Sequence, residues 1–352
     1  MLSAIPADTV REIRQAGLIE QAIFRPSTMS LLSNMLKQSS DEIQRKAKAL
    51  VETKAQIAPD RLTEALDPVE AAKLLELAYQ YSRYLSIRKK QDQKLQAKKA
   101  MSILSARSKI EVEQVFTEHP TPTYRDDEGH HSKRLETSFG RIKDQHFSQL
   151  GLRMAYHDRL DNLPGYLSGA QLEMFHLKLR HTKADNSNNR TTLEALTLID
   201  IASYSPRNDF VSPLSWEVST GLKRPSSYDD ELVAFLSAGW GQTYLLGSQQ
   251  FYGLGFFDFH LDDDIRKGHH LSAGPKIGWL SQHETWSINL EIRQLFDLSG
   301  TKNKLRELEL GLSKTLARHW QVRLVGQYLD LPRDRYRDDS NKTFQFSVMH
   351  YF

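Results

Sequence analysis

The spacing of the apolar residues changes near residue 105, and this change restricts the fold more than any other feature of the sequence. Before it, apolar side chains recur every three or four residues, the period of an α-helix, as they do along 74–85. After it, apolar and polar residues alternate, the period of a β-strand, as they do along 286–293. The sequence therefore predicts an α-helical region over 1–105, a loop-like connector over 106–131 and a β-barrel over 132–352.

About twelve alternating segments follow the connector, each roughly 9–14 residues long, which is near the length of a tilted barrel strand. The predicted strands are 132–141, 145–157, 171–182, 190–203, 213–223, 231–242, 248–260, 269–280, 284–296, 303–314, 318–329 and 341–352. Connections at one end are short, and those at the other are longer in the second half of the domain. The longer ones are 224–230, 261–268, 297–302 and 330–340. Two connections, 158–170 and 204–212, are long although they fall at the short-turn end.

The predicted fold is α+β: an N-terminal α-helical region followed by an antiparallel up-and-down barrel of about 12 strands, of the outer-membrane type. Alternation alone does not say which face is inside. A lumen of this size accepts charged side chains and water, and aromatic residues gather near segment ends on the apolar face. Those residues are Trp216, Trp279, Trp286, Trp320 and Tyr328. A soluble sandwich or ligand-binding barrel is the alternative.

The composition narrows the classes of function. The chain has 352 residues and no Cys, which excludes disulfides, thiolate metal sites and a cysteine nucleophile within it. Its net charge of +3 is too small to indicate nucleic-acid binding. No apolar run is long enough for a transmembrane helix. The start, MLSAIPADTVREIRQ, lacks the apolar core of a signal peptide, so we expect it to be mature or truncated.

Four short stretches carry a resemblance to a bacterial family: 5–10, 128–130, 155–172 and 198–216. They resemble the C-terminal half of the domain-of-unknown-function 4105 family, the Lnb-like periplasmic-domain proteins of Gram-negative bacteria. The resemblance implies a helical linker and a barrel, preceded in longer relatives by a papain-like hydrolase domain with Cys and His. Because this chain has no Cys, the resemblance implies a truncated or split protein without that activity, with a separate hydrolase-like domain as a possible partner.

Two groups of residues carry side chains that a chemical site would need. The candidate ligands of a divalent ion are His119, Glu128, His130, Asp262, Asp263 and Asp264. The candidate catalytic side chains at the barrel rim are His157, Asp158 and Asp161. The structural alternatives are a polar loop at the barrel mouth, a solvated loop tip, and a tight turn that closes at Gly165. No phosphate loop, zinc motif or serine elbow is present, and we expect no cofactor.

Charged residues on the polar face of the strands would fill the lumen of a membrane barrel, either as ion pairs that plug it or as the lining of a pore. They are Lys178, Arg180, Glu217, Lys276, Glu291, Arg293, Glu307, Glu309 and Arg323. The expected function is an outer-membrane anchor that presents a periplasmic helical module over 1–105. The alternatives are a pore for small solutes and a rim hydrolase that uses His157 and Asp158. The expected partners are outer-membrane lipid and the barrel-insertion machinery, because the terminal strand at Phe352 resembles the signal that this machinery reads.

Overall fold

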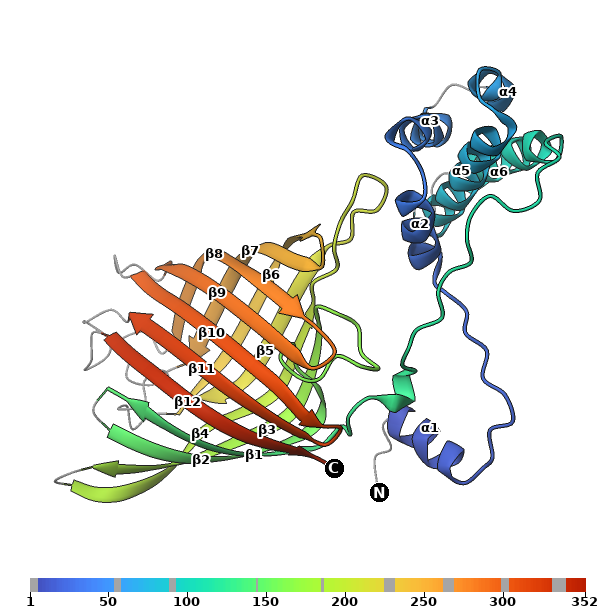
Figure 1. Ribbon diagram of the computed structural model, residues 1–352. Coiled ribbons are helices and arrows are strands. Elements are labelled where there is room, and N and C mark those ends of the chain that lie inside the picture. Colours follow the sequence, from blue (N-terminus) through green and yellow to red (C-terminus); the bar gives the residue numbers. More distant parts are fainter. Residues whose placement is uncertain are drawn as a thin grey trace. The chain divides into compact units, whose positions relative to one another are not determined.

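The computed structural model describes residues 6–53, 58–88, 93–143, 145–184, 187–224, 232–261, 269–298, 304–330 and 340–352. The chain forms two compact units. One, the helical unit, comprises Glu20–Thr123 and Asp209–Val211. The other, the barrel unit, comprises Met1–Ile19, Tyr124–Asn208 and Ser212–Phe352. Figure 1 shows the helices and strands of both.

Twelve antiparallel strands close into a barrel in which each strand pairs with its neighbours in the sequence and β1 pairs with β12. The strands are β1 (Arg134–Ile142), β2 (Gln145–His157), β3 (Ala170–Ala184), β4 (Ser187–Ser203), β5 (Ser215–Lys223), β6 (Val233–Leu246), β7 (Gln249–Leu261), β8 (His269–Gln282), β9 (Trp286–Asp297), β10 (Lys304–Ala317), β11 (Trp320–Asp330) and β12 (Ser340–Tyr351). At the closing seam, Arg134 stands opposite Tyr351 and Phe139 opposite Phe346. The predicted up-and-down barrel is confirmed, and the sandwich alternative is wrong because the sheet closes on itself.

The strands are arranged inside out relative to those of a soluble barrel. On β1, Arg134, Glu136 and Ser138 are buried, whereas Leu135 and Phe139 are exposed. The pattern continues around the barrel, with exposed apolar side chains at Leu150, Leu236, Ile277, Ile292, Leu308, Leu310, Leu324, Phe344 and Phe346. An apolar outside around a charged inside is the arrangement of a barrel that lies in lipid. Parity in the sequence left this choice open, and the side-chain burial decides it.

The connections at the two ends of the barrel differ. At the end where β1 begins and β12 ends, residues 247–248, 283–285 and 318–319 make tight turns. The longer connections predicted at the other end, 224–230, 261–268, 297–302 and 330–340, lie largely outside the described residues.

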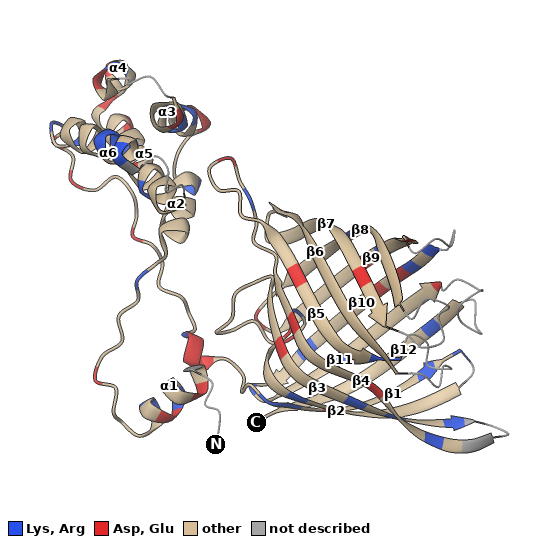
Figure 2. Ribbon diagram, turned by 180° about the vertical axis from the view of Figure 1, so that it is seen from behind, with Lys and Arg blue, Asp and Glu red and all other residues tan. Residues whose placement is uncertain are grey.

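The helix α1 (Pro6–Gln15) belongs to the barrel unit. Arg11 Nε donates to the backbone carbonyl of Asp127 at 3.1 Å, and Arg14 forms an ion pair with the Asp127 carboxylate at 2.7 Å. Asp127 lies in the acidic turn η2 (Asp126–Glu128), which Figure 2 shows in red beside α1. The first helix is therefore tied to the segment that leads into β1.

The helical unit contains α2 (Thr28–Lys37), α3 (Asp41–Glu52), α4 (Pro59–Thr63), α5 (Pro68–Arg88) and α6 (Gln93–Arg107). Two of these helices begin at serine caps, because Ser27 and Ser40 accept hydrogen bonds from backbone N–H groups of the first turn. Leu32, Leu50 and Leu74 belong to the common apolar core of the unit. Among the described helices, none is both long and apolar enough to cross a membrane.

The connection between β4 and β5 also supplies part of the helical unit. Phe210 and Val211 are buried in its core, with 5% and 1% of their surface exposed. The Phe210 ring meets the Tyr81 ring edge-on at 4.8 Å, and Lys48 Nζ donates to the backbone carbonyl of Asp209 at 2.8 Å. This connection is longer than a tight turn because its tip contributes to the core of the helical unit.

Truncating Phe210 tests this contribution. Phe210→Ala is expected to destabilise the helical unit by about 3–5 kcal/mol, because it removes a buried aromatic ring and leaves a cavity. The measurement is amide hydrogen exchange along α5 in the full chain. Leu214→Ala in the same connection, where 56% of the side chain is exposed, is the matched control. Equal exchange rates in the two variants would contradict the assignment of Phe210 to this core.

A charge on the outer face tests the polarity of the barrel. Leu324 lies in the middle of β11 on the exposed face, and Gln327 on the same strand lines the lumen. Leu324→Lys is expected to lower the free energy of unfolding by roughly 2–4 kcal/mol, the effect of a lysine on a lipid-facing strand position. Gln327→Lys is expected to change it little. Denaturant unfolding in lipid vesicles, followed by tryptophan fluorescence, measures both; a larger loss for Gln327→Lys would show that the faces are reversed.

Candidate functional site

The connection between β2 and β3, residues 158–169, folds into the barrel and binds strands on its far side. The backbone carbonyl of Leu160 accepts hydrogen bonds from Ser313 Oγ on β10 at 2.6 Å and from Gln321 Nε2 on β11 at 2.9 Å. Arg159 reaches Glu291 on β9 at 3.1 Å. This connection, which we call the plug, therefore crosses the lumen at the end where the chain enters β1.

Gly311 on β10 makes room for the plug. A Cβ atom at this position would lie 2.4 Å from Leu160 Cδ1, closer than carbon atoms approach one another. Gly311 occupies a lumen-facing place, between the outward Leu310 and Leu312. Because glycine has no side chain, Gly311 leaves the space that Leu160 occupies, which we call the seat of Leu160.

A second set of contacts fastens the other half of the plug. Gln282 on β8 accepts from Ser168 Oγ at 2.8 Å and from the Gly169 N–H at 2.9 Å, and it donates to the Arg159 carbonyl at 2.8 Å. Gln250 on β7 donates to Ser168 Oγ at 2.6 Å. Because the strands that hold the plug run from β7 to β11, the plug is bound along nearly half of the barrel wall.

The start of the plug lies in a cluster of buried ion pairs, which we call the ion-pair cluster. It contains three guanidinium groups and four carboxylates: Arg134, Arg153, Arg323, Glu136, Asp158, Asp161 and Glu173. Asp158 contacts all three arginines, among them Arg323 at 2.8 Å. Asp161 binds Arg153 at 2.7 Å and Arg134 at 2.9 Å. Each of the seven residues is at most 9% exposed.

These arginines decide the ionisation of the two aspartates. Burial disfavours the charged carboxylate, but the arginines outweigh it and hold the pKa of Asp158 and of Asp161 well below the usual range. Charge-assisted hydrogen bonds of this kind are the stronger ones in proteins, and their partners are left uncompensated when one member is lost. The ion-pair cluster therefore fixes the plug in one position.

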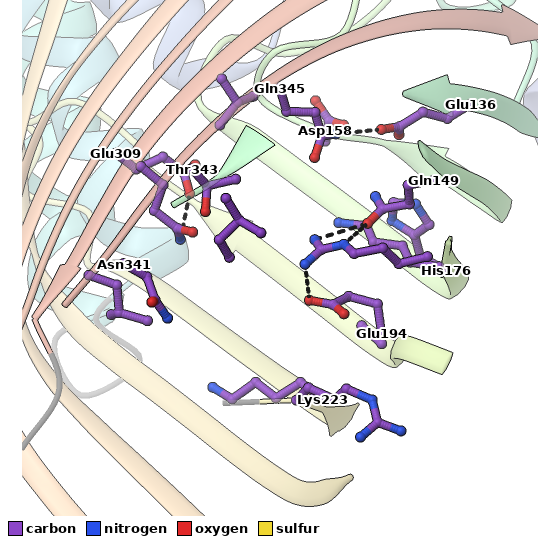
Figure 3. A pocket seen from close by; sticks show the side chains of 18 of the residues that line it. Glu136, Gln149, Asp158, His176, Glu194, Lys223, Glu309, Asn341, Thr343 and Gln345 are labelled. Atoms are coloured by element: carbon purple, nitrogen blue, oxygen red, sulfur yellow. Dashed lines mark hydrogen bonds and ion pairs between the residues drawn. The ribbon is translucent and has the colours of Figure 1, made fainter. Parts of the chain in front are cut away.

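A polar cavity of about 380 Å³ lies in the lumen beside the plug. Glu136, His176 and Glu194 line it together with Glu309 and Asn341. Figure 3 shows these side chains projecting from different strands toward one space. Arg180 also lines it, and its guanidinium group binds Gln149 and Glu194. The lining carries charges of both signs, so the cavity suits polar solutes and water.

Three of the residues predicted as site candidates come together at the rim. His130 Nε2 lies 3.1 Å from His157 Nδ1 and 3.7 Å from Asp161 Oδ2. His157 Nδ1 lies 4.0 Å from the same carboxylate oxygen. All three side chains are at most 2% exposed, and burial lowers the pKa of His130 to about 3. At neutral pH the His130 ring is therefore uncharged.

The other candidates lie elsewhere. His119 is in the helical unit, where its Nε2 lies 2.6 Å from Ser30 Oγ. Glu128 closes the turn η2 by accepting from the Arg125 N–H at 2.8 Å. Asp262, Asp263 and Asp264 lie outside the described residues. Asp158 belongs to the ion-pair cluster, where its carboxylate accepts hydrogen bonds from the arginines and from the Leu160 N–H. Sequence reasoning missed Arg134, Arg153 and Gly311 as parts of the site.

An apolar outer face, a charged lumen and a closed sheet define the class of this protein: a β-barrel of the outer-membrane type. The chain belongs to the family described as a domain of unknown function, DUF7840, whose model matches residues 123–351. A second domain of unknown function, DUF7842, matches residues 22–119. No curated protein matches the sequence.

The chain is also similar to solved barrels. An outer-membrane channel from Pseudomonas putida F1 has 12% identity and a TM-score of 0.37, covering 69% of this chain and 100% of that one. An anion-selective porin from Comamonas acidovorans has 8% identity and a TM-score of 0.32, covering 62% and 98%. The translocator domain of the autotransporter NalP from Neisseria meningitidis has 12% identity and a TM-score of 0.34, covering 62% and 87%.

The resemblance to the domain-of-unknown-function 4105 family is wrong, because the matching family models are different ones and cover both units. The stretch 155–172, which carried much of that resemblance, contains the plug and its ion-pair residues. Short motifs of this kind are set by local packing and hydrogen bonding, so they do not by themselves distinguish families. The expectation of a separate hydrolase-like domain rested on this resemblance and is no longer supported by it.

Neutralising Asp158 tests the ion-pair cluster. Asp158→Asn is expected to destabilise the barrel by about 3–5 kcal/mol, because it removes a buried carboxylate that contacts all three arginines of the ion-pair cluster. Glu284→Gln, in the exposed turn between β8 and β9, is the control and is expected to have an effect within about 0.5 kcal/mol. Denaturant unfolding of both variants in detergent measures the difference. A loss below about 1 kcal/mol for Asp158→Asn would mean that the cluster does not hold the plug.

Proposed function

We propose that this chain is an outer-membrane anchor whose lumen is closed at the periplasmic end and which holds the helical unit in the periplasm. The observation that carries the proposal is the plug, which is bonded to strands β7 to β11 from inside. For a solute to pass this segment its buried ion pairs would have to break, so the contacts favour a membrane-embedded support.

The connections support the orientation. In outer-membrane barrels short turns face the periplasm and longer loops face outward. The tight turns 247–248, 283–285 and 318–319 lie at the end where β1 begins and β12 ends. The chain that precedes β1, and with it the helical unit, therefore leaves the barrel on the periplasmic side.

The connection between β4 and β5 supports the anchor role. Its tip contributes Phe210 and Val211 to the core of the helical unit. The helical unit is thus continuous with the barrel chain at Glu20, at Thr123 and at Asp209–Val211. A domain joined to the barrel by several chain segments moves less freely than a domain joined by one flexible linker. An anchor that holds a periplasmic domain requires this restriction.

A pore for small polar solutes is the second candidate. The polar cavity of about 380 Å³ in the lumen favours it, because a channel needs charged and polar groups along a water-filled space. In this case the plug would have to move away from β10 and β11.

Conductance in planar lipid bilayers separates the two functions. The wild-type chain is expected to give no steady current, and replacement of residues 159–168 by a short Gly-Ser linker is expected to open the lumen. Gly311→Phe, which keeps the plug but fills the seat of Leu160, is expected to give intermittent openings. Gly326→Phe is the matched control, since open space surrounds this glycine and it lies on the outer face of β11. Steady current through the wild type, equal to that of the loop replacement, would establish the pore and overturn the anchor.

A further inference from the structure

His130, His157 and Asp161 form a compact set of potential metal ligands at the barrel rim. They come from three parts of the barrel unit: the segment before β1, the last residue of β2, and the plug. Their ligand atoms are separated by 3.1, 3.7 and 4.0 Å. Two atoms that each bind one ion at about 2.0–2.2 Å can be no more than roughly 4.2 Å apart, and all three separations satisfy this limit. A single ion can therefore contact all three without a backbone movement.

Hydrogen bonds from neighbouring groups hold the three side chains in orientation, as they do for the residues that bind a metal ion in known sites. His130 Nδ1 lies 2.6 Å from the carbonyl oxygen of His131, which requires the proton on Nδ1 and leaves the Nε2 lone pair directed at the set. Asp161 Oδ2 accepts from the Asp158 N–H at 2.9 Å and binds Arg153 at 2.7 Å, so the carboxylate is fixed in place. Tyr351 donates to Asp161 Oδ1 at 2.6 Å.

The His157 ring is held as firmly. It stacks on the Tyr166 ring at 4.0 Å with an angle of 5° between the planes, and Tyr166 donates to the His130 carbonyl at 3.0 Å. His157 Nε2 is buried and has no hydrogen-bond partner among the described residues. Because His130 carries its proton on Nδ1, His157 Nδ1 donates to His130 Nε2 at 3.1 Å, and this is the hydrogen bond that a bound ion would replace. A shift of the proton to Nε2 frees Nδ1 to bind an ion, with no net release of protons.

The charge around the set also suits a cation. In the ion-pair cluster three guanidinium groups contact four carboxylates, which leaves one negative charge while the imidazoles are neutral. Imidazole nitrogen and carboxylate oxygen together are ligands for Zn²⁺ and related divalent ions, whereas Ca²⁺ and Mg²⁺ prefer oxygen alone.

We propose that His130, His157 and Asp161 bind one divalent transition-metal ion, with Zn²⁺ as the ion that the ligand set fits best. The ion joins the segment before β1 to the end of β2 and to the plug, and it acts as a structural link. Because the ligands are at most 2% exposed, the ion is taken up as the barrel folds. This site does not depend on whether the lumen conducts.

The test is to fold the full chain in detergent with Zn²⁺ and remove loosely bound metal by dialysis against a mild chelator. Elemental analysis is expected to find about one Zn²⁺ per wild-type chain and background zinc in His130→Gln and His157→Gln. His319→Gln is the matched control, because His319 and His131 form another histidine pair, with ring centres 4.5 Å apart. This variant is expected to keep the zinc.

Two measurements on the wild type keep the test decisive if a histidine variant does not fold. Folding with Co²⁺ is expected to give the visible absorption of cobalt bound by nitrogen and oxygen, and folding with Zn²⁺ is expected to raise the temperature of heat denaturation. Wild-type chain that folds without retaining zinc and shows no cobalt absorption would overturn the proposal. Zinc retained equally by His130→Gln, His157→Gln and the wild type would also overturn it, since the ion would then be bound elsewhere.

Discussion

The contact between the arginines of the strands and the two aspartates of the plug is the interaction on which the position of the plug depends. A barrel in lipid turns its polar face inward, so its lumen must be filled with water or with mutually satisfied polar groups. Here Asp158 and Asp161 neutralise guanidinium groups from β1, β2 and β11. Without these two carboxylates Arg323 would lose its ion pairs and Arg134 and Arg153 would keep only Glu136 and Glu173. Without the arginines the plug would carry uncompensated charge.

This interaction also links the barrel end to its surroundings. Once Asp158 and Asp161 are fixed, Leu160 reaches the seat at Gly311, and Arg159 reaches Glu291. The same fixation places Asp161 beside His130 and His157. The segment before β1 is tied in turn to α1 by Arg11 and Arg14. A single buried cluster thus organises the entrance of the chain, the plug and the histidine pair.

The fold was predictable from the sequence because a barrel strand is a local pattern. Alternation along 286–293 and 320–328 gives each strand and its two faces, and the closure follows from their number and length. The inward position of a charge such as Arg323 follows from the same parity. Alternation alone does not say which face of the sheet lines the lumen. The burial of Arg134 beside the exposed Leu135 shows that it is the polar face.

The site was less predictable, because it depends on contacts between distant residues. Asp158 and Arg323 are 165 positions apart, and no local pattern relates them. His130 and His157 were each visible as candidates, but their proximity depends on the turn of β1 into β2. The length of the connections 158–170 and 204–212 was the available signal, and both prove to be bound segments: one crosses the lumen, and the other ends in the core of the helical unit.

Amide hydrogen exchange measures directly whether the plug is fixed inside the barrel. In the folded chain the N–H groups of Asp158, Leu160 and Asp161 donate to the carboxylates or backbone of the plug itself, and the segment is held by strands β7 to β11. Residues 158–166 are expected to exchange as slowly as the adjacent strands β2 and β3. Exchange of this segment at the rate of an unstructured loop, while the strands stay protected, would contradict it.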